Sequence, residues 1–479
     1  MIKDIIKERI KKLKELEKKG VNPYPERSLR EYSIEEALKN FSAWARKRKV
    51  IVLAGRIIAK RGHGGVIFCD IKDESFKIQL VLKEDELGEN LIDFFEKYFD
   101  IGDFIEAKGY LFTTQRGEKS LLVKTYSLLS KSLRPLPKAW YGLEDIEERY
   151  RKRYLDLILN KEVKERFILR SQIINLIREF LNKKGYLEVE TPVLQTVYGG
   201  ANARPFITEL EALKTKLYLR IAPELCLKRL IIGGFNKIYE IGKNFRNEGI
   251  DREHNPEFTM LELYAAYHTS RDLQKLTEEL LFYITKKINK TTERNIVLPK
   301  KFKEIDYEEY LFRKTGLKLN DSDDKWLKKA KELKIELTGK ETKEKIWDGV
   351  FKKFRIELEE PCFIVNQPVE ISPLAKRLEN QSHKVSRFQF IWKGWEIVNA
   401  FSELNNPIEQ KERFENQLKM RKRGDLEAHP QDKEFIEALE YGMPPTAGLG
   451  IGIDRLVAVL TGAPSLKEVI FFPFMKSRK

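Results

Sequence analysis

The chain has 479 residues, of which 42% are hydrophobic, and this length accommodates two or three domains with substantial cores. Basic residues number 90 against 74 acidic ones, and the net charge of +16 fits a polyanion-binding protein as well as a plain lysine-rich surface. Three widely separated cysteines without a CxxC pair give no support to a zinc or disulfide framework. The lack of a membrane-length apolar run or a signal peptide predicts a cytoplasmic protein.

Residues 1–49 are predicted to form one basic amphipathic helix and a connector. Ile6, Ile10 and Leu13 are among the apolar residues that recur at helical spacing, with charged residues on the other faces. Gly20 and the Asn-Pro-Tyr-Pro that follows end the helix. Two interpretations stay open: the helix docks on a neighbouring domain, or its lysine face contacts nucleic acid.

Residues 50–133 contain five short β-type runs separated by turns rich in glycine and charge. A helical pattern lies between the third and fourth runs, around DELGENLIDFFEKYF. Five strands with a helix in that place are typical of a Greek-key barrel of the OB type. Such barrels bind single-stranded nucleic acid through aromatic and basic residues on one face.

Residues 134–143 begin with a proline-rich break and are predicted to be a linker. Amphipathic helices follow, and strands then alternate with helices to the end of the chain. We interpret residues 144–479 as one large α+β domain. A mainly helical stretch at about 265–350 is predicted to be a peripheral insertion.

The sequence has no GxxxxGK[ST] phosphate loop and no GxGxxG after a strand, so side chains would have to hold any nucleotide. Residues 241–264 offer suitable groups in a hairpin pattern. Arg246 can bind phosphate bidentately, Glu248 can accept from an adenine amino group, His254 can donate to a terminal phosphate, and Phe258 can stack. Singly, each would more often be an ordinary surface residue; the whole string is far more specific.

A second segment, PPTAGLGIGIDRLVAVLTG, spans residues 444–462. Its glycines let the backbone approach a ligand closely. Arg455 opens an apolar run that is predicted to be a helix, so this cation is expected near a helix N-terminus, where phosphate is favoured. Together the two segments predict an ATP site held by two arginines and a ring.

These segments resemble motifs 2 and 3 of the class II aminoacyl-tRNA synthetases, and GYLEVETPVLQ at 185–195 resembles motif 1. The finer resemblance is to the lysyl-tRNA synthetases. It rests on RYLDLI, GGANARPF, YLRIAPELCLKRL, FRNEGI…HNPEFT, NAFSEL and PPTAGLGIGIDR, which occur in order along nearly the whole chain.

The resemblance implies an antiparallel catalytic sheet flanked by helices and preceded by an OB barrel that reads the anticodon. It implies ATP, L-lysine and lysine tRNA as substrates, Mg²⁺ as cofactor, and a homodimer with Pro192 at its interface. The reaction would form lysyl-adenylate and pyrophosphate, then transfer lysine to the 3′ end of the tRNA. Both steps need alignment and charge neutralisation more than a proton-transfer residue, so no general base is expected.

The resemblance also assigns roles to residues, with Arg246, Arg455 and Glu396 as the catalytic groups. The ATP-binding residues would be Arg246, Glu248, His254, Asn255, Phe258, Glu396, Ile397, Gly452, Asp454 and Arg455. The lysine-binding residues would be Gly200, Glu224, Arg246, Glu262, Tyr264, Asn399, Phe401 and Glu403. A cationic side chain needs an anionic pocket, which three glutamates in matching motifs favour. In the barrel, Arg56, Phe68 and Gln79 would contact the anticodon, with Arg61 and His63 in a nearby glycine-rich turn.

The chain departs from the family at the metal. Two glutamates seven residues apart are usual as magnesium ligands, but here Gln389 precedes Glu396. A glutamine offers only a neutral oxygen, whereas Mg²⁺ prefers carboxylate and phosphate oxygens. We therefore expect Glu396 and the ATP phosphates to carry the main metal site, with Gln389 a weak or water-mediated ligand.

Three alternatives make different demands on the sequence. A synthetase-like paralogue that ligates lysine to a protein usually lacks the barrel, and this chain has one. A catalytically silent nucleic-acid-binding module should have lost Arg246, Glu396 or Arg455, and all three are present. A purely structural protein would have no reason to keep both nucleotide segments.

Overall fold

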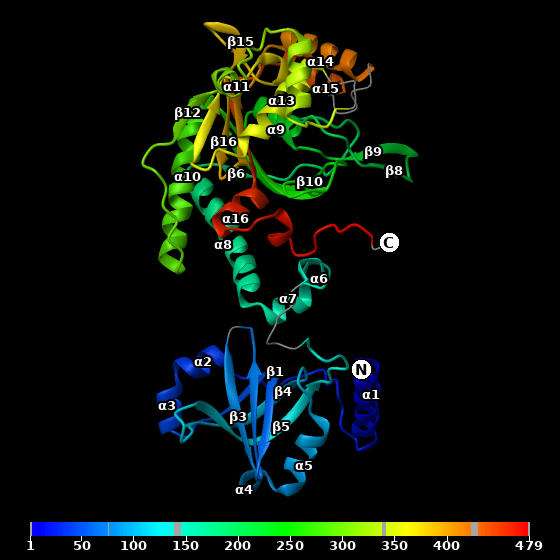
Figure 1. Ribbon diagram of the computed structural model, residues 1–479, viewed down its shortest axis with the longest axis vertical. Coiled ribbons are helices and arrows are strands. Elements are labelled where there is room, and N and C mark those ends of the chain that lie inside the picture. The colour runs from blue at the N-terminus through cyan, green and yellow to red at the C-terminus, as the bar shows by residue number, and fades with distance from the viewer. Residues whose placement is uncertain (1, 75, 138–144, 338–341, 423–429, 478–479) are drawn as a thin grey trace. The chain divides into compact units, whose positions relative to one another are not determined.

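The computed structural model describes residues 2–74, 76–137, 145–337, 342–422 and 430–477. The chain divides into two units, Met1–Glu144 and Asp145–Lys479, each with its own hydrophobic core (Figure 1). The predicted linker at 134–143 lies outside the described residues from 138 onward.

The first unit is a closed five-stranded barrel with strand order β1-β2-β3-β5-β4. Its strands are β1 (Val50–His63), β2 (Val66–Lys72), β3 (Lys77–Lys83), β4 (Phe104–Thr113) and β5 (Lys119–Ser130). Its helices are α1 (Ile2–Lys18), α2 (Ile34–Lys39), α3 (Phe41–Arg46), α4 (Glu84–Leu87) and α5 (Glu89–Tyr98). The OB-type fold is thereby confirmed, with the helical segment between the third and fourth strands as predicted.

Helix α1 packs on the barrel through its apolar and arginine-bearing face. Leu16 is fully buried in the barrel core, and Arg9 donates to the carbonyls of Ser132 at 2.9 Å and Ile101 at 3.0 Å. The opposite face carries exposed lysines at helical spacing, which are Lys3, Lys7, Lys11, Lys14 and Lys18. Docking of the helix therefore leaves its lysine face free to meet a polyanion.

The second unit is built on an eight-stranded sheet with order β12-β13-β16-β17-β18-β11-β10-β6, whose inner pairs are antiparallel. These strands are β6 (Leu187–Glu188), β10 (Lys237–Phe245), β11 (Glu257–Ala266), β12 (Lys303–Asp306), β13 (Cys362–Val365), β16 (Arg387–Trp392), β17 (Trp395–Ser402) and β18 (Thr446–Gly452). Smaller sheets join β7 (Leu194–Gln195), β8 (Ile207–Leu210) and β9 (Thr215–Leu219), and β14 (Arg377–Leu378) with β15 (Gln381–Val385).

Helices cover this sheet and supply the other half of its core. They are α6 (Ile146–Arg151), α7 (Arg153–Leu159), α8 (Lys161–Lys183), α9 (Glu224–Ile232), α10 (Ser270–Thr291), α11 (Tyr307–Thr315), α12 (Asp323–Glu332), α13 (Lys343–Arg355), α14 (Pro407–Lys422), α15 (Lys433–Glu440) and α16 (Ile453–Thr461). In Figure 1, α8, α10 and α16 lie beside the sheet. The antiparallel sheet flanked by helices is the expected catalytic architecture.

The segment predicted as a peripheral insertion, about 265–350, differs from that prediction in its first part. Leu273, Leu280 and Ile284 of α10 are buried in the main core against the sheet, because the apolar face of this long helix is continuous. Helices α11, α12 and α13 instead bury a separate cluster around Trp326 and Phe351. Strand β13, which follows them, pairs with β16, so α13 is tied to the sheet.

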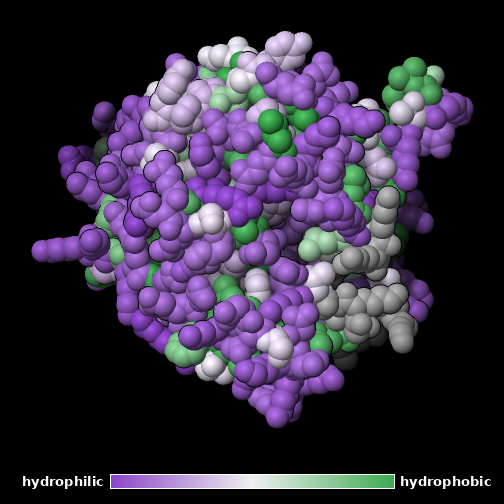
Figure 2. All heavy atoms as spheres, turned by 90° about the horizontal axis from the view of Figure 1, so that it is seen from above, coloured by the Kyte–Doolittle hydropathy of each residue, from purple (hydrophilic) through white to green (hydrophobic). Residues whose placement is uncertain are grey.

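No helix among the described residues is both long and apolar enough to cross a bilayer. The face shown in Figure 2 is predominantly hydrophilic, and its hydrophobic residues lie in small separate groups.

Candidate active site

A cavity of about 300 Å³ opens over the central strands of the second unit. It gathers residues from the β10–β11 hairpin, from β17 and β18, from the start of α9, and from the start of α16. The predicted residues that line it are Gly200, Glu224, Arg246, Glu248, His254, Asn255, Phe258, Glu262, Tyr264, Glu396, Ile397, Asn399, Phe401, Gly452, Asp454 and Arg455. Glu403 and Gln389 do not line it.

Glycines of β18 create this space. Gly448 lies between Tyr264 of β11 and Phe401 of β17 in the register, and Gly450 lies between Glu262 and Asn399. A Cβ at Gly448 would lie 2.4 Å from Cε1 of Tyr264, too close for any side chain. Residues paired across neighbouring strands have their side chains on the same face of the sheet. Because Gly448 and Gly450 have no side chain, they leave space on that face between the side chains of their partners.

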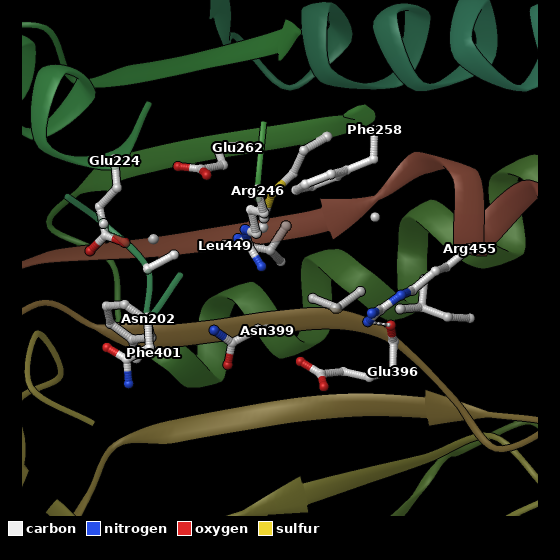
Figure 3. A pocket seen from close by; sticks show the side chains of 18 of the residues that line it. Asn202, Glu224, Arg246, Phe258, Glu262, Glu396, Asn399, Phe401, Leu449 and Arg455 are labelled. Carbon is white, nitrogen blue, oxygen red and sulfur yellow. Dashed lines mark hydrogen bonds between the residues drawn. The ribbon is translucent and has the colours of Figure 1, made fainter. Parts of the chain in front are cut away.

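One end of the cavity is acidic. Glu224 and Glu262 point into it from α9 and β11, with Phe401 opposite (Figure 3). Tyr264 Oη donates to Glu262 at 3.2 Å, and no basic side chain in the described part of the chain pairs with this carboxylate. Burial, reinforced by the nearby charge of Glu224, raises the pKa of Glu262 to about 8. This carboxyl group is therefore poised to ionise when a cation arrives.

The other two glutamates of this end share a buried lysine that the sequence analysis missed. Lys228 Nζ lies 2.6 Å from Glu224 Oε1 and forms an ion pair with Glu403, and its side chain is fully buried. Burial opposes protonation of Lys228, but the two carboxylates outweigh it and raise its pKa. Glu403 therefore holds Lys228 and is not among the residues that line the cavity. Because Glu224 and Lys228 are four residues apart on a helix, their spacing in APELCLK was an available signal.

Gly200 closes the acidic end. Its φ of +87° favours glycine, and a Cβ there would lie 2.8 Å from the Cβ of Glu224 and 3.0 Å from that of Ala222. The backbone at this point therefore packs directly against the helix that carries Glu224.

The opposite end is cationic and aromatic. The Arg246 guanidinium lies 5.0 Å from the centre of the Phe258 ring, and both side chains reach into the cavity (Figure 3). Arg455 follows Gly452 at the N-terminus of α16 and donates to the carbonyl of Glu396 at 2.9 Å. A guanidinium, a helix N-terminus and a ring face together suit a nucleotide triphosphate.

Several predicted nucleotide residues also hold the hairpin in place. Asp454 accepts from the Thr259 backbone N–H at 2.9 Å and pairs with Arg170 at 2.6 Å, which ties α16 to β11 and α8. His254 Nδ1 lies 2.8 Å from Asp251. In addition, Asn255 donates to the carbonyl of Glu257 at 2.6 Å, and Glu248 lines the cavity. These contacts shape the loop between β10 and β11.

Glu396 is surrounded by cations. Burial alone would raise the pKa of its carboxyl, but Arg455, Arg355, Arg387 and Lys352 bring it below its usual value. Arg355 Nη1 lies 3.3 Å from Glu396 Oε2. Arg387 lines the cavity and donates to Asn399 Oδ1 at 2.9 Å. Neither arginine was predicted from the sequence.

Gln389 is buried on β16, opposite Asn399 in the register. No group of three or more His, Cys, Asp or Glu side chains in the described ranges is arranged as a metal site. The strand next to that of Glu396 therefore presents the neutral amide of Gln389 where a second carboxylate is usual.

The predicted anticodon residues lie on the barrel of the first unit. Phe68 alternates with core residues of β2 and so faces outward, directly across from Arg61 on β1. Gln79 on β3 pairs with Asp70, two residues from Phe68, which places it on the same face. Arg56 donates to the Gly102 carbonyl at 3.1 Å and lies over the Phe104 ring.

Arg61 lies on strand β1 itself rather than in the predicted turn. The side chain of His63 lies outside the described residues.

Comparison with known proteins matches both units. Residues 145–476 match the family model described as tRNA synthetases class II (D, K and N), and residues 51–129 match that of the OB-fold nucleic acid binding domain. Relatives named "Lysine--tRNA ligase" include one from Carboxydothermus hydrogenoformans, 49% identical over 100% of this chain and 99% of its own length. One from Thermotoga maritima is 45% identical over 100% and 97%, and one from Aquifex aeolicus is 49% identical over 90% and 73%.

Proposed function

The chain belongs to the lysyl-tRNA synthetases of class II, ATP-dependent enzymes that ligate lysine to tRNA, and we propose that its cavity divides this reaction between a lysine end and an ATP end. The observation that carries the division is that one end is lined by glutamates while the other is lined by Arg246, Arg455 and the Phe258 ring.

Charge matching supports L-lysine as the amino acid. Glu224, Glu262 and Glu403 supply three carboxylates and Lys228 one ammonium, so these four groups carry a net charge of −2 when all are ionised. The α-ammonium and ε-ammonium groups of lysine carry two positive charges. Because a buried charge must be paired, this balance favours a dication over a neutral side chain. Asn399 and Phe401 line the same end and enclose the methylene stem.

Arg246 links the two ends. It lies between the acidic groups and Phe258 in Figure 3, where one guanidinium can bind both the lysine carboxylate and the α-phosphate. A carboxylate oxygen of lysine attacks the α-phosphorus. The bond between the α-phosphorus and the oxygen that bridges it to the β-phosphorus breaks, and pyrophosphate leaves. Phe258 stacks on adenine, and Arg455 at the α16 N-terminus neutralises the terminal phosphate. No proton transfer is required, because the nucleophile is already ionised.

In the second step a hydroxyl oxygen of the terminal ribose of lysine tRNA attacks the lysyl carbonyl carbon and releases its proton to solvent. The bond from that carbon to the phosphate oxygen breaks, and AMP leaves. We assign anticodon recognition to the barrel face that carries Phe68, Gln79 and Arg56, since an outward-facing ring beside polar groups suits base stacking. The exposed lysines of α1 are positioned to bind tRNA phosphates.

Magnesium accompanies ATP in this proposal as its phosphate complex. A protein site with two carboxylates does not fit the residues present, because Gln389 is neutral and Glu396 is already bonded to Arg355.

A homodimer through residues 185–195 and a cytoplasmic location are part of the same proposal. Leu187, Val193 and Leu194 are exposed apolar side chains in that segment, which is the kind of surface that a partner subunit covers. A sedimentation measurement that shows only monomer at micromolar concentration would exclude the proposed homodimer.

Lysine-dependent exchange of pyrophosphate into ATP, followed by charging of purified lysine tRNA, tests the proposal. Both activities are expected. Exchange without charging would favour the paralogue that ligates lysine to a protein, and no exchange with any amino acid would reject the assignment of the cavity.

A further inference from the structure

A buried guanidinium lies behind two residues that line the ATP end. Arg355 ends α13 and is 4% exposed. Its Nη1 lies 3.3 Å from the carboxylate of Glu396 on β17, and its Nη2 is hydrogen-bonded to the carboxylate of Glu253 in the loop between β10 and β11. Both glutamates line the cavity. One arginine therefore connects the β10–β11 loop to the sheet, and it does so through the carboxylate of Glu396 that a divalent cation would also need.

The electrostatics of this corner disfavour a protein-held metal ion. Glu396, Glu253 and Asp348 supply three carboxylates, whereas Arg355, Lys352, Arg387 and Arg455 supply four cations. A carboxylate at position 389 would offset the excess of positive charge, but Gln389 is neutral and 6% exposed. A dication entering here would have to displace a buried ion pair and would meet a net positive environment.

The Nε–H group of Arg355 is a further hydrogen-bond donor. Its Nε has no hydrogen-bond partner in the part of the chain that the structure describes. A buried guanidinium N–H without an acceptor is costly, so the contacts of Arg355 with Glu253 and Glu396 have to offset this cost for the side chain to stay in place. A guanidinium is planar, remains charged and matches phosphate geometry.

We propose that Arg355 takes the place of a protein-bound magnesium ion at Glu396, so that this chain holds one divalent ion fewer than a site with a carboxylate at 389 and no arginine at 355. Arg355 acts here as a positioning residue: its positive charge holds Glu396 and Glu253 together beside the phosphates. The proposal rests on the placement of ATP at this end of the cavity.

Direct counting of bound Mn²⁺ by electron paramagnetic resonance tests it without using activity. The full chain is titrated with Mn²⁺ alone and with a non-hydrolysable ATP analogue. The double variant Arg355→Met/Gln389→Glu, called the Arg355 pair, is compared with a matched control, Arg313→Met/Gln389→Glu. The two have the same net charge, but the control loses an exposed arginine of α11 instead. The wild type and the control are expected to hold Mn²⁺ only through the nucleotide. The Arg355 pair is expected to hold one more ion, with an affinity at least about tenfold above any nucleotide-free binding of Mn²⁺ that the control shows.

Equal extra binding in the control, or an extra ion in the wild type, would overturn the proposal, as would no gain in the Arg355 pair. Should that pair fold poorly, Arg355→Lys/Gln389→Glu, which retains a cation, serves instead: it is expected to resemble the control, and an extra ion in it would count against the inference. The titration without nucleotide depends only on these side chains. Failure of the analogue to bind the wild type would instead reject the placement of ATP, so the two failures can be told apart.

Discussion

The ammonium of Lys228 lies 2.6 Å from a carboxylate oxygen of Glu224 and is fully buried beneath the acidic end of the cavity. Lys228 therefore fixes the position of Glu224, which lines the cavity, and also pairs with Glu403. The lysine end depends on a cation supplied by the protein as well as on its carboxylates.

Substitution Lys228→Met is expected to raise the KM for lysine at least tenfold and to lower the free energy of unfolding by about 3–5 kcal/mol, because it leaves two buried carboxylates unpaired. Pyrophosphate exchange and urea denaturation measure the two effects. The exposed Lys214→Met is the matched control and should change neither. An unchanged KM in Lys228→Met would show that the ion pair does not position the pocket.

Lysine binding should strengthen as pH rises towards 8. The pKa of Glu262 is raised from 4.5 to about 8 by burial, so the group is mostly protonated at pH 7, and the ammonium of lysine binds best to its ionised form. Calorimetry at pH 6.5 and 8.0 should show tighter binding at the higher pH and proton release at the lower. Glu262→Gln should bind weakly at both values; a similar pH dependence in that variant would assign the titration to another group.

The same shift has a consequence for stability. Because the pKa of Glu262 is higher in the folded chain than its ordinary value, the folded state binds the proton more tightly, and the contribution of this group to stability is lost as pH rises from about 4.5 to 8. Lysine should offset that loss. Thermal unfolding with and without lysine at pH 6 and 8 should therefore show larger stabilisation by lysine at pH 8, and equal stabilisation would contradict it.

Gly200→Ala should damage lysine binding without affecting ATP. The new Cβ would meet Glu224 at 2.8 Å and would require a φ of +87° that alanine rarely adopts. We expect the KM for lysine to rise at least tenfold, with the KM for ATP within about twofold of the wild type. A selective increase in the KM for ATP would contradict the assignment of Gly200 to the lysine end of the cavity.

Phe68→Ala should separate the two steps. Removal of a stacking ring costs about 1–3 kcal/mol per base, so charging of lysine tRNA should fall while lysine-dependent exchange stays normal. Leu91→Ala, at an exposed apolar site on α5, is the control. Unchanged charging in Phe68→Ala would refute the role assigned to this barrel face.

The sequence predicted the parts of the site that lie within single motifs. Arg246, Phe258 and Glu262 come from one hairpin, and Gly452 with Arg455 from one strand–helix junction, so local patterns placed them together. They lie in one cavity because of the register in which β11, β17 and β18 pair. The resemblance of the motifs to a known family implied this arrangement, and the strand pairing explains it.

Arg355 was missed because it ends a helix that was interpreted as peripheral and whose local pattern carries no functional signal. The structure ties that helix to the sheet through its packing on Ile391 of β16 and through the ion pair of Arg355 with Glu396. Glu403 was expected to line the pocket, but in the structure it pairs with Lys228 and is not among the lining residues. Helix α10 shows the same limit, since its amphipathic pattern could not tell which surface it would cover.

The most direct test of the central claim compares lysine with norleucine, which has the same carbon chain but no ε-ammonium, in amino-acid-dependent pyrophosphate exchange. If buried carboxylates recognise that ammonium, norleucine leaves them unpaired, and kcat/KM should fall by about 10⁴. Exchange with norleucine at a rate close to that with lysine would contradict the account.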